Sequence, residues 1–310
     1  MSESIHVFAP ATVANVVCGY DALGFAVAEP GDEVIVKKTT TPGIRITKIT
    51  GDEGKLSLIP EKNTGGFALL QLLQMVDPGI GFEMELHKKM PFGSGLGSSA
   101  ASAVAAVFAA NQLLDAPLTN EQLIYCTMKS EEMASGSPHA DNVAPCLFGG
   151  FVLIRSNDPV DVIPLDYPKP LFCAIVHPKI EISTKNAREI LKQNIDLKQA
   201  AEQWANVGGL VAGLLLKDYD LMGRSMVDNV IEPARGLLIP GFDDVKKAAM
   251  ETGAIGAGIS GSGPSIFALA KSEEDAVGIG KLMVRSFRKL EIESEAFISA
   301  INDKGPIILD

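Results

Sequence analysis

The sequence predicts an α+β protein built from two domains. Short β-branched runs alternate with turn clusters in the first half, whereas helical and strand patterns alternate in the second half. A proline-bearing, turn-rich segment at residues 157–170 separates the two halves. A chain of 310 residues also has room for two domains of roughly 100–200 residues each. We therefore predict one domain over residues 1–167 and another over residues 168–310.

The first half predicts a largely antiparallel sheet with helices packed against it. Its strand candidates are short runs rich in β-branched residues, at residues 32–38, 43–49, 81–87 and 150–155. Its helix candidates have apolar residues at helical spacing or many small residues, at residues 63–75, 98–114 and 119–134. Thr119 and Gln122 form a capping-box pattern, which predicts that the third helix begins there.

The second half predicts strands that alternate with helices. The strand candidates are residues 171–177, 265–270 and 295–301. The helix candidates are residues 197–218, 243–252 and 273–289. This alternation is typical of a ferredoxin-like α+β sandwich.

Composition excludes several classes of function. The formal net charge of -11 and the pI near 4.9 disfavour nucleic-acid binding, which needs clustered Lys and Arg. The four cysteines are far apart and predict neither a zinc site nor a disulfide framework, which fits a reducing cytosol. The start of the chain lacks a signal-peptide pattern, and the weakly polar stretch at residues 100–114 is too short to cross a bilayer. We expect a cytoplasmic protein that binds neither membrane nor nucleic acid.

A glycine-rich loop at residues 91–102, PFGSGLGSSAAS, is the most informative segment. Its glycines let the backbone approach a ligand closely, and the helix that follows offers unpaired N–H groups and a positive dipole end. The segment therefore predicts an anion cradle suited to a triphosphate, and a serine hydroxyl at the junction could bind Mg²⁺. A tight turn before a capped helix is the alternative. The P-loop lysine and the protein-kinase motifs are absent.

A second glycine-rich segment, GAGISG at residues 256–261, matches the dinucleotide fingerprint G-x-G-x-x-G. It follows a predicted helix and leads into a predicted strand, which is the reverse of the Rossmann order. We therefore reject a dinucleotide site. A turn that wraps a polar group of the active site and a plain connecting turn both remain open.

Three ordered segments resemble the motifs of the GHMP kinases, a superfamily named after galactokinase, homoserine kinase, mevalonate kinase and phosphomevalonate kinase. They are PATVANVVCGYD at residues 10–21, the loop at residues 91–102, and GISGSGPS at residues 258–265. GSPHADNVAP at residues 136–145 and NVIEPAR at residues 229–235 resemble the homoserine kinases within it. The resemblance implies a GHMP kinase fold, with a ribosomal protein S5 domain 2-like first domain and a ferredoxin-like second domain. The first motif departs from the usual LGPGFD, because this chain has VVCGYD.

The resemblance implies that ATP and Mg²⁺ bind in the first domain. Ser98 and Glu131 would hold the metal, although Glu131 alone would be interpreted as an exposed helical glutamate. Asn63 and Lys88 would line the purine pocket, although Lys88 beside Lys89 could equally be a surface pair. The nucleotide would contact the following residues: Asn63, Lys88, Pro91, Gly93, Ser94, Gly95, Leu96, Gly97, Ser98, Ser99, Ala100 and Ala101.

The resemblance also implies a site for L-homoserine, a zwitterion with a side-chain hydroxyl. Its amino and hydroxyl groups would contact Asn15, Asp21, His139 and Asn142. Its carboxylate would contact Arg188 and Arg235, since guanidinium groups suit carboxylates. Without the resemblance, a surface Arg188 and a structural His139 would be the better interpretations.

The implied reaction is ATP-dependent phosphorylation of L-homoserine to O-phospho-L-homoserine in threonine biosynthesis, by a homodimer. The residues implied in catalysis are Asn142, Glu131, Ser98 and Arg235. Since an asparagine cannot accept a proton as a carboxylate does, the implied mechanism has no dedicated side-chain base. Asp141 is expected to point away from the site. A GHMP kinase for another alcohol, such as mevalonate, and a non-catalytic nucleotide-binding regulator are the rival hypotheses.

Overall fold

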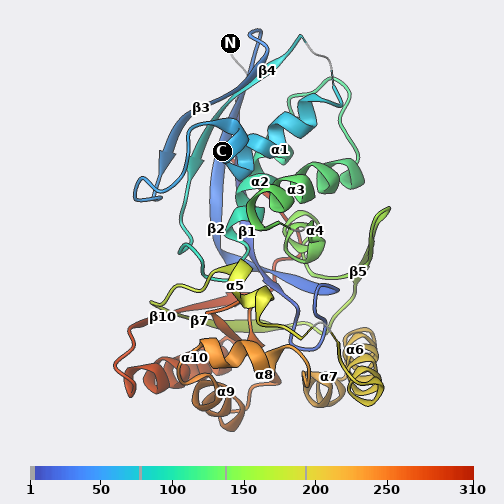
Figure 1. The fold of residues 1–310 in the computed structure, drawn as a ribbon, viewed down its shortest axis with the longest axis vertical. Coiled ribbons are helices and arrows are strands. Elements are labelled where there is room, and N and C mark those ends of the chain that lie inside the picture. Colours follow the sequence, from blue (N-terminus) through green and yellow to red (C-terminus); the bar gives the residue numbers. More distant parts are fainter. Residues whose placement is uncertain (1–3, 77–78, 137, 193) are drawn as a thin grey trace.

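The computed structural model describes residues 4–76, 79–136, 138–192 and 194–310. Figure 1 shows two parts stacked along the long axis, each with its own sheet and helices. Helices α1 to α4 belong to the upper part and α6 to α10 to the lower part, while α5 lies at the junction. The predicted two-domain α+β architecture is confirmed.

The larger sheet has the strand order β11-β1-β2-β4-β3, and β5 pairs with both β2 and β6. Its pairs are antiparallel except β3 with β4, which agrees with the predicted, largely antiparallel sheet. The strands are β1 (Ser4–Ala14), β2 (Leu23–Thr39), β3 (Gly43–Thr50), β4 (Gly81–His87), β5 (Phe151–Asn157), β6 (Val160–Leu165) and β11 (Ile307–Leu309).

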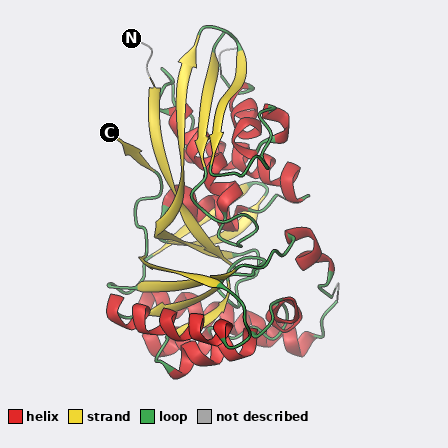
Figure 2. Cartoon of the chain, turned by 90° about the vertical axis from the view of Figure 1, so that its left-hand side faces the viewer, coloured by secondary structure: helices red, strands yellow, loops and turns green. Residues whose placement is uncertain are grey.

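Helices cover one face of this sheet, as Figure 2 shows. They are η1 (Pro60–Lys62), α1 (Thr64–Leu73), α2 (Ser98–Asn111), α3 (Asn120–Ser135) and α4 (Ala140–Phe148). Helix α2 packs on β1 and β2, and its alanines are buried because small side chains allow this close approach. The capping box of Thr119 and Gln122 is present at the start of α3, as predicted.

The smaller sheet has the antiparallel order β10-β7-β9-β8, and helices other than α5 lie on its face away from the larger part (Figure 2). The strands are β7 (Phe172–Pro178), β8 (Gly256–Ile259), β9 (Ile266–Ala270) and β10 (Ser294–Ala300). The helices are α5 (Thr184–Glu189), α6 (Leu197–Leu216), α7 (Tyr219–Ser225), α8 (Glu232–Arg235), η2 (Gly236–Leu238), α9 (Phe242–Glu251) and α10 (Glu273–Arg288). The predicted ferredoxin-like arrangement is confirmed.

The two parts share a buried core. Phe25 of β2 and Phe267 of β9 contact each other edge to face, with ring centroids 5.7 Å apart. Both rings are buried, and the same apolar cluster contains residues from both sheets. A second cluster lies between the smaller sheet and α9 and α10. The junction between the parts is therefore packed like a protein interior, which fixes the groups on either side of it.

Several features differ from the predicted segmentation, among them β1, β8, α4 and α7, which we had not predicted. Strand β6 lies inside residues 157–170, which we had interpreted as a connection, and it forms a hairpin with β5. Strand β11 crosses back from the end of the chain to pair with β1 of the larger sheet. The division of the chain into domains at residues 167 and 168 stays a prediction. Strand β11 belongs to the second predicted domain in sequence but pairs with the sheet of the first. In the described ranges, no helix is both long enough and apolar enough to cross a bilayer.

Candidate active site

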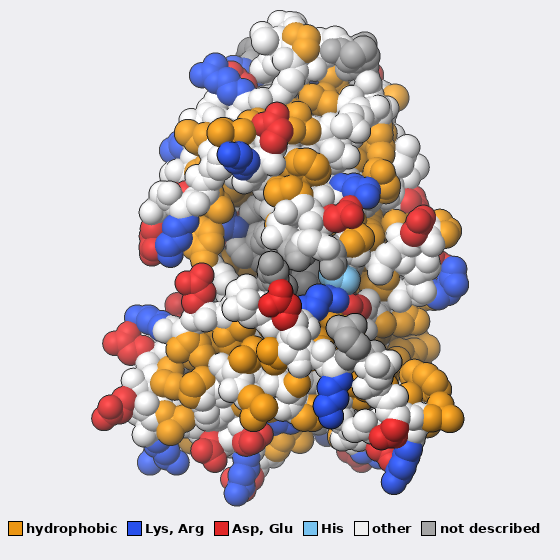
Figure 3. Space-filling view, viewed as in Figure 1, with side chains coloured by type: hydrophobic (Ala, Val, Ile, Leu, Met, Phe, Trp, Pro, Cys, Tyr) orange, Lys and Arg blue, Asp and Glu red, His pale blue; other side chains and the backbone are white. Residues whose placement is uncertain are grey.

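A cleft of about 610 Å³ is lined by residues from both parts of the chain. Figure 3 shows the hollow between the upper and lower parts, with a histidine and charged side chains at its edge. The cleft brings together most of the predicted site residues: Asn15, Asp21, Asn63, Lys88, Gly93, Ser94, Gly95, Gly97, Ser98, Ser99, Glu131, His139, Asn142, Arg188 and Arg235. Leu96, Ala100 and Ala101 are instead buried behind the loop. Ser137 of the quoted motif lies outside the described residues.

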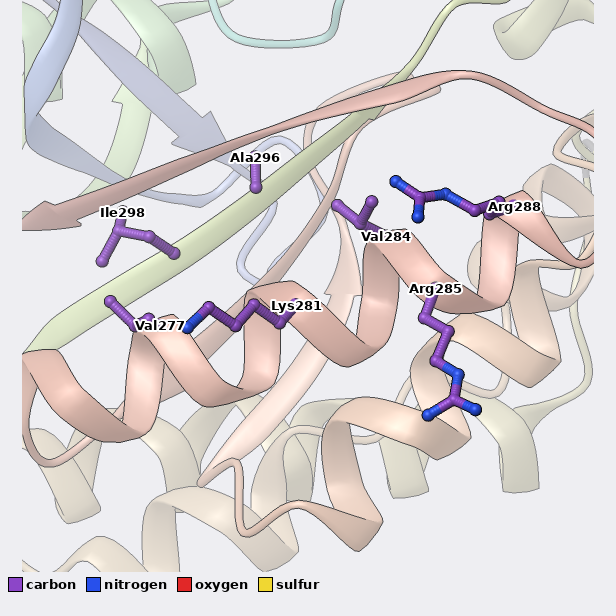
Figure 4. A pocket seen from close by; sticks show the side chains of 7 residues that line it. All are labelled: Val277, Lys281, Val284, Arg285, Arg288, Ala296 and Ile298. Carbon is purple, nitrogen blue, oxygen red and sulfur yellow. The ribbon is translucent and has the colours of Figure 1, made fainter.

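A groove of similar volume, about 590 Å³, lies between α10 and β10. Figure 4 shows apolar side chains along it, with Lys281 and Arg288 at its edge and Arg285 turned away. Its lining contains no carboxylate and no glycine-rich loop. The chemistry of the sequence motifs therefore belongs to the cleft.

The glycine-rich loop adopts a backbone that only glycine accommodates easily. Gly93, Gly95 and Gly97 all have positive φ, at 60°, 75° and 67°. A Cβ at Gly95 would lie 2.4 Å from the carbonyl oxygen of Ser260, and a Cβ at Gly97 would lie 2.1 Å from the Thr12 hydroxyl. Helix α2 starts at the next residue, so its free N–H groups face the cleft.

The three sequence motifs meet at this loop. The backbone N–H of Thr12 donates to the carbonyl of Leu96 at 3.0 Å, and the hydroxyl of Ser260 donates to that of Gly95 at 2.7 Å. The N–H of Ser265 donates to the carbonyl of Ser94 at 3.2 Å. The Ser94 hydroxyl is buried without a hydrogen-bond partner among the described residues. It is thus available to an anion in the loop.

The second glycine-rich segment forms β8 and the turn into β9, so rejection of the Rossmann interpretation is confirmed. Gly261 and Ser262 in that turn line the cleft. The carbonyl of Gly261 accepts hydrogen bonds from Asn15 Nδ2 and Arg235 Nη1, both at 2.9 Å. The turn therefore holds polar groups of the site, one of the two roles left open by the sequence.

Lys88 is buried under the start of α2, so the alternative of a surface pair is wrong for this residue. Its ammonium pairs with the buried carboxylate of Asp32 and donates to Ser98 O at 2.9 Å and to the Ser102 hydroxyl at 2.8 Å. Lys89 is the exposed member of the pair, with 54% of its side chain accessible. The charge of Lys88 therefore lies at the loop-helix junction.

Glu131 lies on α3 with its carboxyl group buried in the cleft wall, so the alternative of an exposed glutamate is wrong. Burial raises the pKa of Glu131, while a hydrogen bond with Ser99 and the charge of Lys88 offset part of the rise. Glu131 and Ser98 supply the oxygen ligands that Mg²⁺ prefers. The donor set fits a magnesium ion that would complete its coordination with phosphate oxygens.

At the other end of the cleft, Asp21 faces two basic side chains. Arg188 donates to both of its carboxylate oxygens, at 3.1 and 3.2 Å, and His139 Nδ1 lies 3.7 Å from Oδ2. Burial lowers the pKa of His139, and the charge of Asp21 opposes this shift. Both ring nitrogens of His139 lack hydrogen-bond partners among the described residues. A neutral imidazole is therefore available to a polar ligand.

Arg235 is buried and firmly held. Its Nε donates to the carbonyl of Ala187 at 3.2 Å, in addition to the bond from Nη1 to Gly261. Burial lowers its pKa, and the charge of Arg188 acts in the same direction. Tyr20 lies against both guanidinium groups, with ring centroid distances of 5.1 Å to Arg235 and 5.4 Å to Arg188. We had not predicted a role for Tyr20.

Asn142 lies between the two ends of the cleft. The Thr12 hydroxyl donates to its Oδ1 at 2.7 Å, and a Cβ at Gly97 would lie 2.8 Å from the same atom. Asp141 was expected to point away, but it lines the cleft in a buried position. Burial and the charge of Asp21 raise its pKa to about 7. The first turn of α4 thus presents both residues to the site, because it starts at the cleft wall.

Residues 65–150 match the family model of the GHMP kinases N terminal domain, and residues 210–284 match that of the GHMP kinases C terminal. A homoserine kinase from Chlorobium phaeobacteroides (strain BS1) is 48% identical over 314 residues, which cover 97% of this chain and 98% of the relative. One from Chlorobium phaeovibrioides (strain DSM 265 / 1930) is 49% identical over 319 residues, covering 99% and 100%. The chain belongs to the homoserine kinase family.

Solved structures agree with this assignment. The crystal structure of homoserine kinase from Cytophaga hutchinsonii ATCC 33406 is 56% identical, with a TM-score of 0.96 over 100% of this chain and 98% of that one. The mevalonate kinase of L. major in complex with R-mevalonate is 20% identical, with a TM-score of 0.68, and covers 98% and 99% of the two chains. The second comparison concerns the fold alone.

Proposed function

We propose that this member of the homoserine kinase family transfers the γ-phosphate of ATP to the side-chain hydroxyl of L-homoserine. One observation carries the proposal: a single cleft holds an anion cradle at one end and the Asp21, Arg188 and Arg235 set at the other. Asn142 lies where the two ends meet, beside Gly97 of the loop. This arrangement suits a reaction that needs alignment of a phosphate with an acceptor hydroxyl.

The triphosphate is proposed to lie in the glycine-rich loop. The N–H groups at the start of α2, the Ser94 hydroxyl and the ammonium of Lys88 favour negative charge there. Lys88 thus suits the phosphate end and not the purine pocket where we first placed it. The Asn63 side chain caps α1 by accepting from Gly66 N at 3.2 Å, so its proposed contact with the purine would be as part of the wall.

The metal is proposed to be Mg²⁺, held by Ser98 and Glu131. When bound, it would neutralise charge on the phosphate oxygens during transfer. Glu131 is buried near Lys88, so its carboxylate is positioned to balance a cation placed in the cleft. The chain's own contribution is to fix these oxygen ligands on two different helices, α2 and α3.

The amino acid is proposed to bind with its ammonium near Asp21 and its carboxylate near Arg188 and Arg235. Arg235 is already held by two carbonyl groups, which leaves Nη2 as its remaining guanidinium nitrogen for an anion. Asn15 Oδ1 accepts from the N–H of Asp21 at 3.0 Å, and its Nδ2 is bonded to Gly261. Asn15 therefore shapes the loop around Asp21 as well as lining the site.

The acceptor hydroxyl is proposed to react without a dedicated base. Asn142 Oδ1 already accepts a bond from Thr12 and cannot take up the proton, which would pass to the transferred phosphate. The hydroxyl is oriented by the His139 and Asn142 side chains. Asp141 is the carboxylate next to Asn142 in the chain, and its pKa, raised to about 7, leaves it partly protonated near neutral pH.

The test is turnover by the purified chain with MgATP and, separately, L-homoserine, L-threonine, L-serine and mevalonate. ADP release with homoserine and a phosphorylated product by mass are expected, with loss of this activity in Arg235→Ala. ADP release with mevalonate alone would mean that the substrate is that of another member of the superfamily. Tight ATP binding without turnover of any alcohol would favour a non-catalytic regulator instead.

We place the reaction in threonine biosynthesis in the cytoplasm, and we propose a homodimer. The four cysteines are buried and free, as in a reducing compartment. Helix α6 exposes an apolar face in which Leu197 is 75%, Trp204 65% and Leu215 51% accessible, and Figure 3 shows hydrophobic side chains where Figure 1 places α6. A Cβ at Gly208, one turn from Trp204, would meet nothing within 4 Å.

Two copies of α6 packed antiparallel about a twofold axis near residue 206 would place each Trp204 over the partner's Gly208. Sedimentation velocity tests this: Trp204→Glu is expected to convert a dimer to a monomer. Leu58→Glu, a change at a 55% exposed residue of the first domain, is the matched control. A monomeric wild type, or a Trp204→Glu variant that stays dimeric, would contradict the α6 interface.

A further inference from the structure

We propose that Tyr20 is a positioning residue whose ring holds Arg188 and Arg235 together at the carboxylate end of the cleft. The inference rests on the proposed function, in which these two guanidinium groups bind the carboxylate of the amino acid. It adds Tyr20, a residue for which we had predicted no role.

The ring of Tyr20 lies within cation–π distance of both guanidinium groups. The Cζ atoms of Arg235 and Arg188 are 5.1 and 5.4 Å from its centroid, inside the limit of about 6 Å for this attraction. The two arginines come from separate elements, α5 and α8. One aromatic ring thus contacts arginines from two short helices, and both arginines are proposed to bind the same ligand.

The two arginines need such a group because their charges repel each other. The charge of Arg188 lowers the pKa of Arg235, which shows that the two guanidinium groups are close enough to oppose each other. Asp21 offsets the charge of Arg188 through a two-bond salt bridge. When a ligand's ammonium binds Asp21, the carboxylate of Asp21 offsets less of the positive charge of Arg188. The ring of Tyr20 still contacts both guanidinium groups.

The loop that carries Tyr20 is well fixed. Asn15, Val16, Val17 and Asp21 all have positive φ, and the N–H of Gly19 donates to the carbonyl of Asn15 at 2.8 Å. Tyr20 directly precedes Asp21, so one turn positions both the aromatic platform and the carboxylate. The backbone of this loop therefore fixes the position of the ring independently of the two arginines.

The ring of Tyr20, and not its hydroxyl, contacts the two guanidinium groups. Variants that keep or remove the ring therefore test the proposal separately. Burial and the charge of Asp21 raise the pKa of Tyr20, so the phenol stays neutral at working pH. Tyr20→Phe keeps the aromatic face and is expected to keep KM for L-homoserine within about twofold. Tyr20→Leu removes it and is expected to raise that KM about tenfold, with kcat and KM for ATP changed less than about threefold.

A series of mono-, di- and trifluorinated phenylalanines at position 20 separates electrostatics from packing. Fluorine withdraws charge from the ring face while its shape is nearly conserved, so KM for L-homoserine should rise with each fluorine. The rise should vanish for 3-amino-1-propanol, which has the ammonium and hydroxyl but no carboxylate. Melting temperatures of the series, expected to be equal, show that folding is retained even where Tyr20→Leu unfolds.

The outcomes are distinguishable. Equal KM values across the fluorinated series, with an active wild type, would overturn the cation–π role and leave Tyr20 as a packing residue. A KM rise that is the same for 3-amino-1-propanol would overturn its link to the carboxylate. A wild type that does not turn over L-homoserine would instead refute the proposed function.

Discussion

The carboxylate of Asp21 and the guanidinium of Arg188 face each other through two hydrogen bonds of 3.1 and 3.2 Å. They satisfy each other across the end of the cleft where a zwitterion is proposed to bind. Homoserine carries both an ammonium and a carboxylate, so it can replace each partner of the pair without changing the net charge of the site. Charge-assisted bonds of this type are also strongly directional.

This exchange predicts how Asp21→Asn affects different substrates. The variant should lower kcat/KM for L-homoserine about 10- to 100-fold, because a charged hydrogen bond to the ammonium contributes about 1.5–3 kcal/mol. It should change kcat/KM for 4-hydroxybutyrate less than about threefold, because that alcohol has no ammonium for Asp21 to bind. Steady-state kinetics with both substrates measure this. Asp161→Asn, at an exposed ion pair with Arg155, is the control, and equal losses for both substrates would contradict the prediction.

The proposed metal ligand predicts a changed Mg²⁺ requirement. Glu131→Gln removes a carboxylate charge from the buried wall of the cleft, so the Mg²⁺ concentration for half-maximal activity should rise about tenfold or more. Glu132→Gln is the matched control, since this neighbour pairs with Lys129 at the surface. A magnesium titration of initial rates at fixed ATP distinguishes the two. An unchanged requirement in Glu131→Gln would remove this residue from the metal site.

Lys88 and Lys89 provide adjacent lysines in opposite environments. Lys88→Met leaves the buried Asp32 carboxylate without its charged partner, which should lower the free energy of unfolding by about 3–5 kcal/mol. Lys89→Met loses only an exposed pair with Glu33 and should cost less than about 1 kcal/mol. Urea denaturation measures both. Adding Asp32→Asn to Lys88→Met should restore part of the stability, and a further loss would contradict the pairing.

Much of the site was predictable because its signals are local. Three alternating glycines before a small-residue helix predict a loop with positive φ and free N–H groups, and the structure has both. The capping box at Thr119 follows from two residues in one turn. Such patterns depend only on residues that are neighbours in the sequence, so they can be recognised without knowledge of the fold.

The missed features depend on contacts between distant residues. Asp32 lies on β2, and its partner Lys88 directly follows β4. No local sequence pattern connects the two residues. Tyr20 acquires its role from arginines on α5 and α8. Strand β1 was missed because it contains Pro10, and its pairing with β2 shifts register between Pro10 and Thr12. Pairing with β2 stabilises β1 as a strand in spite of its proline.

The buried Asp141 predicts an unusual dependence of stability on pH. Its pKa is raised from 3.8 to about 7, chiefly by burial and then by the charge of Asp21, with Arg188 and Arg235 opposing. In the unfolded chain the carboxyl group ionises near pH 4. Between these values the folded state binds more protons than the unfolded state, so this group's contribution makes stability fall as pH rises through that window.

Asp141→Asn removes the ionisable group and with it this fall. Relative to wild type, the free energy of unfolding of the variant should therefore rise between pH 4 and pH 8, by up to about 4 kcal/mol for a shift of about three pKa units. Urea denaturation of both proteins at pH 4, 6 and 8 measures the difference. Asp161→Asn, at an exposed position, should show a nearly constant difference. A flat difference for Asp141→Asn as well would mean that this carboxyl group is ionised in the fold across the whole range.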